Sequence, residues 1–242
     1  MLAIDLFGPP QILRDAEPLT IPRKKSRALI YYLAAHNKPL TRDHLLNFFW
    51  PDSDRAAAQQ TLRTTLHGLR QVIGGALIAA ENTIGLSAEI QIDARIFEAR
   101  LTQPTTNLET LIATLVLYRG DFLTDFNLDD AGEYDNWIIG QQEHYRRLAV
   151  RGYLALTQQH ESQQNYAEAL TALDRALTFD PLQEDLQRAA LRLHYLAGDR
   201  AGAIRRYDHL RKLLNAEMGM PPMAETRAMY DAIINDTLAT TY

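Results

Sequence analysis

The chain has 242 residues, of which 46% are hydrophobic and 23% charged, and it contains no cysteine. This composition is typical of a globular protein, and the length suits one large domain or two ordinary ones. The lack of cysteine excludes disulfides and thiolate metal sites. No apolar run reaches the roughly 18 residues of a membrane span, and the N-terminal MLAIDLFGPP lacks the features of a signal peptide. We therefore expect a cytoplasmic protein.

The charge is unevenly distributed along the chain. The formal net charge is −5, but residues 1–100 hold 12 Lys and Arg against 10 Asp and Glu, a balance of +2. Residues 101–242 hold 13 against 20, a balance of −7. A mildly basic front half joined to an acidic back half favours two units with different partners, and the alternative explanation is chance.

Short strands are expected at the start of the chain. Residues 2–7, 11–14 and 19–21 are short apolar segments between turn residues, which predicts a small antiparallel sheet ended by Pro22. Residues 23–35 form a helix that begins with RKKSR, a cationic start that opposes the helix dipole. Two explanations stay open for these cations, namely contact with phosphates or a solvated charged surface.

Two further helices and a hairpin follow. Thr41 is expected to cap a short helix that ends at Trp50–Pro51, because proline cannot continue the helix. A long helix spans about 54–73 and is closed by Gly74–Gly75. Strands near residues 77–87 then form a hairpin. Three helices followed by a hairpin make a winged helix-turn-helix, in which the long helix is the recognition helix.

The long helix has two contrasting faces. At about 100° per residue, one face is aliphatic and holds Leu62, Leu66, Leu69 and Ile73. The opposite face carries polar groups without a carboxylate, from Gln60, Arg63, Thr64, His67 and Gln71. Exposed helix faces usually mix acids and bases. A donor-rich face without acids therefore indicates a partner that repels carboxylates, such as DNA phosphate.

The front half resembles the DNA-binding region of SARP-type (antibiotic-regulatory) transcriptional activators. The resemblance rests on IPRKKSRALIYYLAAHNKPLTRDHLLNFFWPD, on FFWPDSDRAAAQQTLRTTLHGLRQVIG and on IQIDARIFEARL, and it covers nearly all of residues 1–101. It implies a winged helix of the OmpR type. Two positions depart from the pattern, since Gly68 and Gln71 stand where many relatives carry basic residues. Fewer phosphate contacts than usual are therefore expected.

The back half is expected to be helical after the polar linker TQPTTN at 102–107. Residues 165–170 align with 199–204 at an offset of 34, with alanine at packing positions, which is typical of tetratricopeptide-like helix pairs. The stretch YRGDFLTDFNLDDAGEYDNWI, followed by these repeats, resembles the bacterial transcriptional activation domain of SARP-type regulators.

The expected fold is mainly α with a minor antiparallel β component. A winged helix-turn-helix domain at 1–101 is followed by an all-α, tetratricopeptide-like bacterial transcriptional activation domain at 104–242. No nucleophile–base pair, zinc-helix spacing or phosphate-binding glycine loop is present in the sequence. We therefore expect no enzyme, no cofactor and no metal.

The leading hypothesis is a sequence-specific regulator of transcription that reads the major groove with residues 57–72. Four side chains are expected to contact base edges: Gln60, Arg63, Thr64 and His67. Six are expected to contact phosphates: Lys24, Lys25, Arg27, Arg70, Asn82 and Thr83. The alternative for His67, less favoured within a recognition helix, is a plain surface histidine without a role.

The resemblance implies several partners. It implies an activator that binds direct repeats in double-stranded DNA, as a homodimer on the DNA, and that contacts RNA polymerase subunits. It also implies self-association through the helical domain, and no membrane partner is expected. The alternative hypothesis is an interaction scaffold, in which the repeats bind a partner protein and the winged helix does not read DNA.

Overall fold

The computed structural model describes residues 1–103, 107–128 and 132–238. Residues 104–106, within the expected linker, lie outside the described residues. The chain forms two compact units, of which the first comprises Met1–Thr106 and Ala113–Arg146 and the second Asn107–Ile112 and Arg147–Tyr242. This division by contacts differs from a boundary between residues 101 and 104, and the sequence-based domains stay a prediction.

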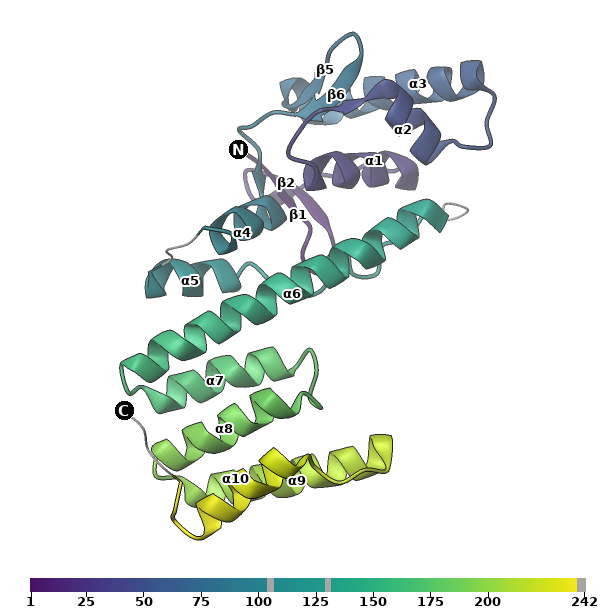
Figure 1. The fold of residues 1–242 in the computed structure, drawn as a ribbon. Helices are drawn as coiled ribbons and strands as arrows, with labels where there is room; N and C mark the ends of the chain where they lie inside the picture. Colours follow the sequence, from purple (N-terminus) through teal and green to yellow (C-terminus); the bar gives the residue numbers. More distant parts are fainter. Residues whose placement is uncertain (104–106, 129–131, 239–242) are drawn as a thin grey trace. The chain divides into compact units, whose positions relative to one another are not determined.

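The chain is mainly helical with small sheets, as predicted (Figure 1). The first sheet has the order β3-β2-β1-β7, in which β7 pairs with β1 in parallel and the other pairs are antiparallel. Its strands are β1 (Leu2–Asp5), β2 (Gln11–Arg14), β3 (Glu17–Pro18) and β7 (Gln91–Ile92). The third strand lies at Glu17–Pro18 and not at 19–21, because Asp15 and Ala16 form a two-residue turn with φ of 52° and 68°.

The predicted winged helix-turn-helix is confirmed in the first unit. Its helices are α1 (Lys24–Ala35), α2 (Arg42–Phe49) and α3 (Arg55–Ile73), and a short 3₁₀ helix, η1 (Gly74–Ala76), follows. The second sheet has the order β4-β6-β5. Its strands are β4 (Leu40–Thr41), β5 (Leu77–Ala79) and β6 (Thr83–Leu86). The hairpin β5–β6 is the wing, and α4 (Asp93–Leu101) follows β7.

Local side chains begin and end these helices where the sequence predicts. The Thr41 hydroxyl accepts a hydrogen bond from the His44 backbone N–H at 3.2 Å and so caps α2. The Asp54 carboxylate accepts from the first N–H groups of α3. Gly74 ends α3 with a φ of +60°, a conformation that side chains with a Cβ disfavour.

Three cations bind the C-terminal carbonyl groups of the three helices. Arg95 donates to the backbone oxygens of Ala34 and Leu33 in α1, at 2.7 and 2.8 Å, and also to that of His36. Lys25 donates to the Phe49 oxygen at the end of α2 at 2.9 Å. Arg14 donates to the Val72 oxygen of α3 at 2.7 Å. The last carbonyls of a helix lack intrahelical partners, and cations are favourable there, so these contacts hold the three helices in place.

Aromatic residues from the back half complete the core of the first unit. The ring of Phe7 lies 5.0 Å from that of Phe97, 5.0 Å from that of Tyr118 and 5.1 Å from that of Tyr145. Tyr145 belongs to α6 (Gly132–Ser162), a continuous helix that is shared by the two units. Because α6 and the segment before it supply these rings, residues 113–146 group with the winged helix.

An ion pair between a buried carboxylate and a half-exposed arginine also connects this segment to the first sheet. The Asp93 carboxylate accepts from the backbone N–H groups of Leu6 and Phe7 at 2.8 and 3.1 Å, and Arg119 donates to it at 2.9 Å. Arg119 also pairs with Asp5 at 3.0 Å. Burial raises the pKa of Asp93 to about 6, against the opposing effect of its hydrogen bonds.

The second unit contains the predicted repeat. After α5 (Leu108–Leu115), which is shared between the units, and α6, its helices are α7 (Tyr166–Leu177), α8 (Glu184–Leu196), α9 (Arg200–Met218) and α10 (Ala224–Ile234). The starts of α7 and α9 lie 34 residues apart, and the equivalent residues Ala169 and Ala203 are both fully buried. Helix α8 packs against α7, α9 and α10 (Figure 1). Small residues at these positions let the helices approach closely.

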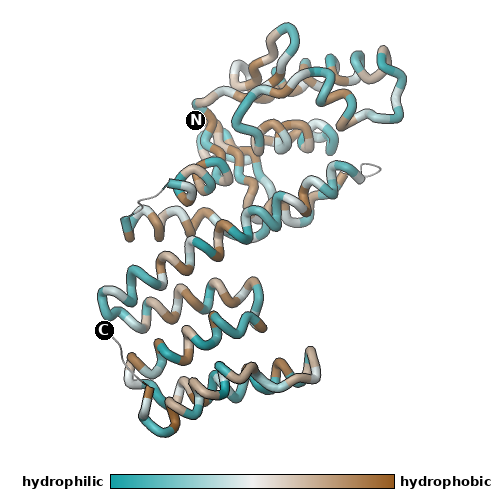
Figure 2. Tube along the Cα trace, viewed as in Figure 1, coloured by the Kyte–Doolittle hydropathy of each residue, from teal (hydrophilic) through white to brown (hydrophobic). Residues whose placement is uncertain are grey.

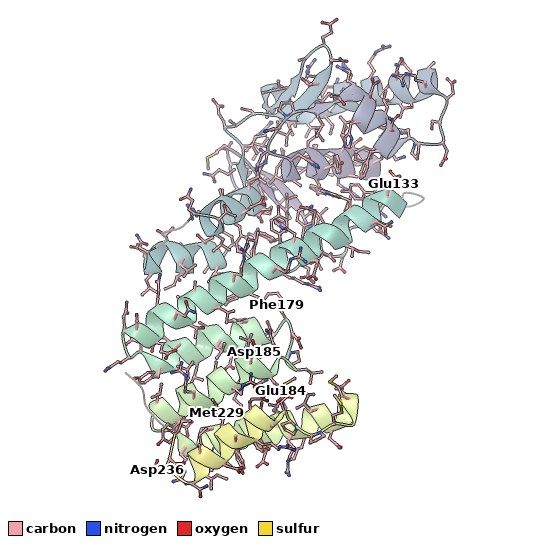
Figure 3. All side chains as sticks on the ribbon, viewed as in Figure 1. Glu133, Phe179, Glu184, Asp185, Met229 and Asp236 are labelled. Carbon is pink, nitrogen blue, oxygen red and sulfur yellow. The ribbon has the colours of Figure 1, made fainter. Side chains whose placement is uncertain are left out.

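A buried carboxylate connects the start of α8 to the start of α10. Glu184, labelled in Figure 3, lies at the start of α8. It accepts hydrogen bonds from the Met223 backbone N–H and from the Thr226 hydroxyl, the latter at 2.6 Å. It thereby satisfies donors at the start of α10.

Within the described parts of the chain, every helix is too short or too polar to span a lipid bilayer.

Candidate nucleic-acid interface

Helix α3 has the two faces that its sequence predicts. Leu62, Leu66, Leu69 and Ile73 are buried, with exposed fractions of 2%, 7%, 1% and 3%. Of the polar residues between them, Arg63, Thr64, His67, Arg70 and Gln71 are exposed and Thr65 is buried. Figure 2 shows polar and apolar residues alternating along this helix. The aliphatic face therefore fixes α3 to the rest of the winged helix and leaves the other face open to solvent.

The four side chains expected to contact bases are all exposed on α3. Arg63 donates to the Gln60 side-chain oxygen at 3.2 Å, and the Thr64 hydroxyl donates to the Gln60 backbone oxygen at 3.0 Å. His67 shares a hydrogen bond of 3.2 Å with Gln71. Exposed hydrogen bonds of this kind contribute little free energy, since water competes for them. The side chains can therefore exchange these partners for groups of a ligand.

A polar groove of about 720 Å³ lies beside this face, between α3, the start of α2 and the wing. Helix α3 contributes its charged and polar walls through Arg55, Gln59, Arg63, His67 and Arg70. Leu62 and Leu66 contribute apolar surface, and the wing contributes Ala79, Glu81 and Asn82. The groove thus brings together four of the sequence-predicted residues, Arg63, His67, Arg70 and Asn82. Gln60 and Thr64 are not among its lining residues and lie on the outward side of α3.

Arg42 holds the wing in place and was not identified from the sequence. It lines the groove at the start of α2 and donates to the backbone oxygens of Glu81 at 2.9 Å and Ala80 at 3.3 Å. Its own N–H donates to the Asn82 oxygen at 3.0 Å. Thr83 continues the contact by pairing with Thr41 between β6 and β4. A cation in the first turn of a helix is unfavourable with respect to the helix dipole. The position of Arg42 at the start of α2 was therefore the feature of the sequence that could have indicated a contact outside its own helix.

The cations at the start of α1 contact the protein itself. Lys24 donates to the Asn127 side-chain oxygen at 2.7 Å, and Arg27 donates to the Ile21 backbone oxygen at 3.0 Å. Lys25, besides its contact with α2, lies 5.3 Å from the centre of the Trp50 ring. All three are only partly exposed, and none is among the residues that line the groove. Their assignment to phosphates stays a prediction.

The charges of the groove favour an anion. Four arginines, Arg42, Arg55, Arg63 and Arg70, line it together with the two carboxylates of Asp43 and Glu81. A concave surface with an excess of one charge concentrates ions of the opposite sign. Among the described residues, no group of three or more His, Asp or Glu side chains is placed to hold a metal ion. The groove is therefore suited to binding phosphate by arginine.

Comparisons with known proteins give one family. The model of the family described as bacterial transcriptional activator domain matches residues 92–234. The chain is 25% identical over 245 residues to the regulatory protein AfsR of Streptomyces griseus, covering 96% of this chain and 24% of that protein. It is 22% identical over 245 residues to the transcriptional regulatory protein MoaR1 of Mycobacterium tuberculosis, covering 95% of this chain and 78% of that protein.

EmbR proteins of two mycobacteria are also similar to this chain, one by its sequence and one by its solved structure. The chain is 25% identical over 254 residues to the transcriptional regulatory protein EmbR of Mycobacterium bovis, covering 96% of this chain and 63% of that protein. The structure of Mycobacterium tuberculosis EmbR in complex with a low affinity phosphopeptide aligns with a TM-score of 0.71 at 21% identity, covering 98% of this chain and 66% of that chain. The fold is therefore shared, and this chain spans less than two thirds of AfsR and of the M. bovis EmbR.

Proposed function

Because this chain belongs to the bacterial transcriptional activator domain family, as its resemblance to SARP-type regulators predicted, we propose that it binds specific DNA sequences and activates transcription. The observation that carries the proposal is the exposed, acid-free face of α3 beside a groove lined by four arginines. The relatives are named as regulatory proteins and not as enzymes. We accordingly propose no catalytic activity and no cofactor.

In this proposal α3 lies in the major groove of double-stranded DNA and reads base edges. Gln60 and Thr64 lie on the outward side of α3, and Arg63 and His67 line the groove beside it. A guanidinium can pair with guanine and an amide with adenine, each through two hydrogen bonds. The burial of the opposite face supports this orientation, because only the polar face is free to meet the DNA.

One sugar–phosphate backbone would then run through the groove between α3 and the wing. Arg70 and Asn82 line the groove, and Thr83 lies next to Asn82 in the wing. Arg42 fixes the distance between the wing and α2. Lys24, Lys25 and Arg27 bind groups of the protein itself and do not line the groove, so we expect them to contribute less.

The helical repeats would serve as the interaction domain. We propose that they self-associate on direct repeats of the DNA or contact RNA polymerase subunits, which would place the protein in the cytoplasm with the DNA. The stack of α7 to α10 supports this role, because repeats of paired helices present continuous surfaces to partners. The sequence-based domains at 1–101 and 104–242 are proposed as the two functional modules.

The test is selection of bound sequences from random DNA at near-physiological salt, followed by titrations with the best site. Binding should weaken with salt, with a log–log slope of roughly −0.9 per neutralised phosphate. Arg63→Ala should weaken specific binding by about 1–3 kcal/mol and relax the sequence preference. Lys212→Ala, which removes an exposed cation of α9 outside the winged helix and the groove, is the control.

Two outcomes would contradict the proposal. An unchanged isotherm and an unchanged preference for Arg63→Ala would refute the role of that side chain. Absence of any salt-sensitive DNA binding by the wild-type protein would refute DNA recognition and leave the scaffold hypothesis.

A further inference from the structure

We propose that Asp43 limits the affinity of the groove for DNA by occupying Arg55, a phosphate-binding side chain that the sequence did not reveal. This inference rests on the proposed function and adds a residue that tunes it. The Arg55 guanidinium donates to the Asp43 carboxylate at 2.6 Å, and both side chains line the groove. Arg55 is the first residue of α3, and Asp43 lies in the first turn of α2.

The pair is open to exchange. The side chains of Arg55 and Asp43 are 63% and 65% exposed, so water screens their attraction and the pair is worth little. A phosphate in the groove offers the same guanidinium another charge-assisted contact and so competes with the Asp43 carboxylate for it. Binding there requires Arg55 to leave Asp43, and the released carboxylate then faces the phosphate. Both effects oppose DNA binding.

The other charged groups of the groove do not provide the same exchange. Arg42 is held by the backbone oxygens of Ala80 and Glu81 and is needed to keep the wing in place. Glu81 is the second carboxylate of the groove, and it lies in the wing between β5 and β6. Among the described residues that line the groove, Asp43 is the carboxylate that forms an ion pair with an arginine, so its removal releases a cation.

Competition by the Asp43 carboxylate increases the share of the binding free energy that the base contacts must supply. Phosphate contacts add affinity for every DNA sequence equally, whereas base contacts distinguish sequences. A carboxylate that competes for one phosphate-binding arginine lowers affinity for all DNA by the same factor. Binding of the whole site then depends more on the base contacts of α3, since they must supply a larger share of the free energy.

The experiment compares DNA affinity and its salt dependence for the whole chain and three variants. Asp43→Asn removes the charge but keeps the size of the side chain. Asp52→Asn is the matched control, because Asp52 is an exposed acid next to α3 that does not line the groove. The third variant combines Asp43→Asn with Arg55→Gln. Thermal unfolding followed by circular dichroism establishes that each variant is folded.

Asp43→Asn should bind both the selected site and unrelated DNA more tightly, by up to about fivefold at low salt, which corresponds to about 1 kcal/mol. Its log–log salt slope should steepen by about 0.9, the value for one additional phosphate. Asp52→Asn should change neither quantity appreciably, and the double variant should lose the gain.

Three results would overturn the inference in distinguishable ways. Equal effects of Asp43→Asn and Asp52→Asn, with normal binding by the wild type, would show a general charge effect and leave the proposed function standing. Weaker binding by Asp43→Asn would show that Asp43 itself contacts the DNA, for example a cytosine amino group. Failure of the wild-type chain to bind any DNA would refute the proposed function and this inference together.

Discussion

Replacement of Arg95 by methionine should destabilise the first unit by about 2–4 kcal/mol. Arg95 is half-buried and donates to the backbone oxygens of Leu33, Ala34 and His36, which form the end of α1. A hydrogen bond from a charged donor is worth about 1.5–3 kcal/mol, and carbonyls left without a partner add a desolvation cost. Because the site is only partly buried, water replaces some of these bonds, and the expected loss is smaller than the sum of the three.

Urea unfolding, monitored by tryptophan fluorescence, measures the free energy of unfolding of the first unit. The chain has two tryptophans, Trp50 and Trp137, and both belong to the first unit. Methionine keeps an apolar stem and removes the guanidinium group, so most of the packing of the stem is retained. Lys38→Met removes an exposed cation after the same helix and should change the free energy of unfolding by less than about 0.5 kcal/mol. Equal effects of the two substitutions would refute the role assigned to the carbonyl contacts of Arg95.

Two further predictions concern pH and the second unit. Burial lowers the pKa of His36, so the folded state favours its neutral form. The free energy of unfolding should therefore fall as the pH drops below about 6.5, by up to about 1.4 kcal/mol per pH unit. The substitution His36→Gln should flatten this dependence in urea titrations. The same slope in both proteins would rule this out. Glu184→Gln should destabilise the second unit by about 1–3 kcal/mol, because the amide cannot replace all the bonds that the carboxylate accepts from Met223 and Thr226. Thermal circular dichroism checks this against Asp185→Asn, an exposed neighbour, and identical midpoints for the two variants would contradict it.

The local features of this fold were predictable from the sequence. The spacing of Leu62, Leu66 and Leu69 identified the buried face of α3, and Thr41 identified where α2 begins. The repeat of 34 residues identified the paired helices of the second unit. Each of these signals depends on residues a few positions apart, or on a pattern that returns at a fixed interval, so one chain is enough to reveal it.

The partners of charged and aromatic side chains were decided only by the tertiary structure. RKKSR was open to interpretation as a phosphate-binding segment, yet Lys25 binds the end of α2. Arg55 and Arg42 belong to the groove only because α2, α3 and the wing meet there. Phe7 packs on Tyr118 and Tyr145, more than a hundred residues away, which places part of the back half in the core of the first unit. Helix periodicity determines which way a side chain points, whereas its partner is set by which distant segments pack against that face.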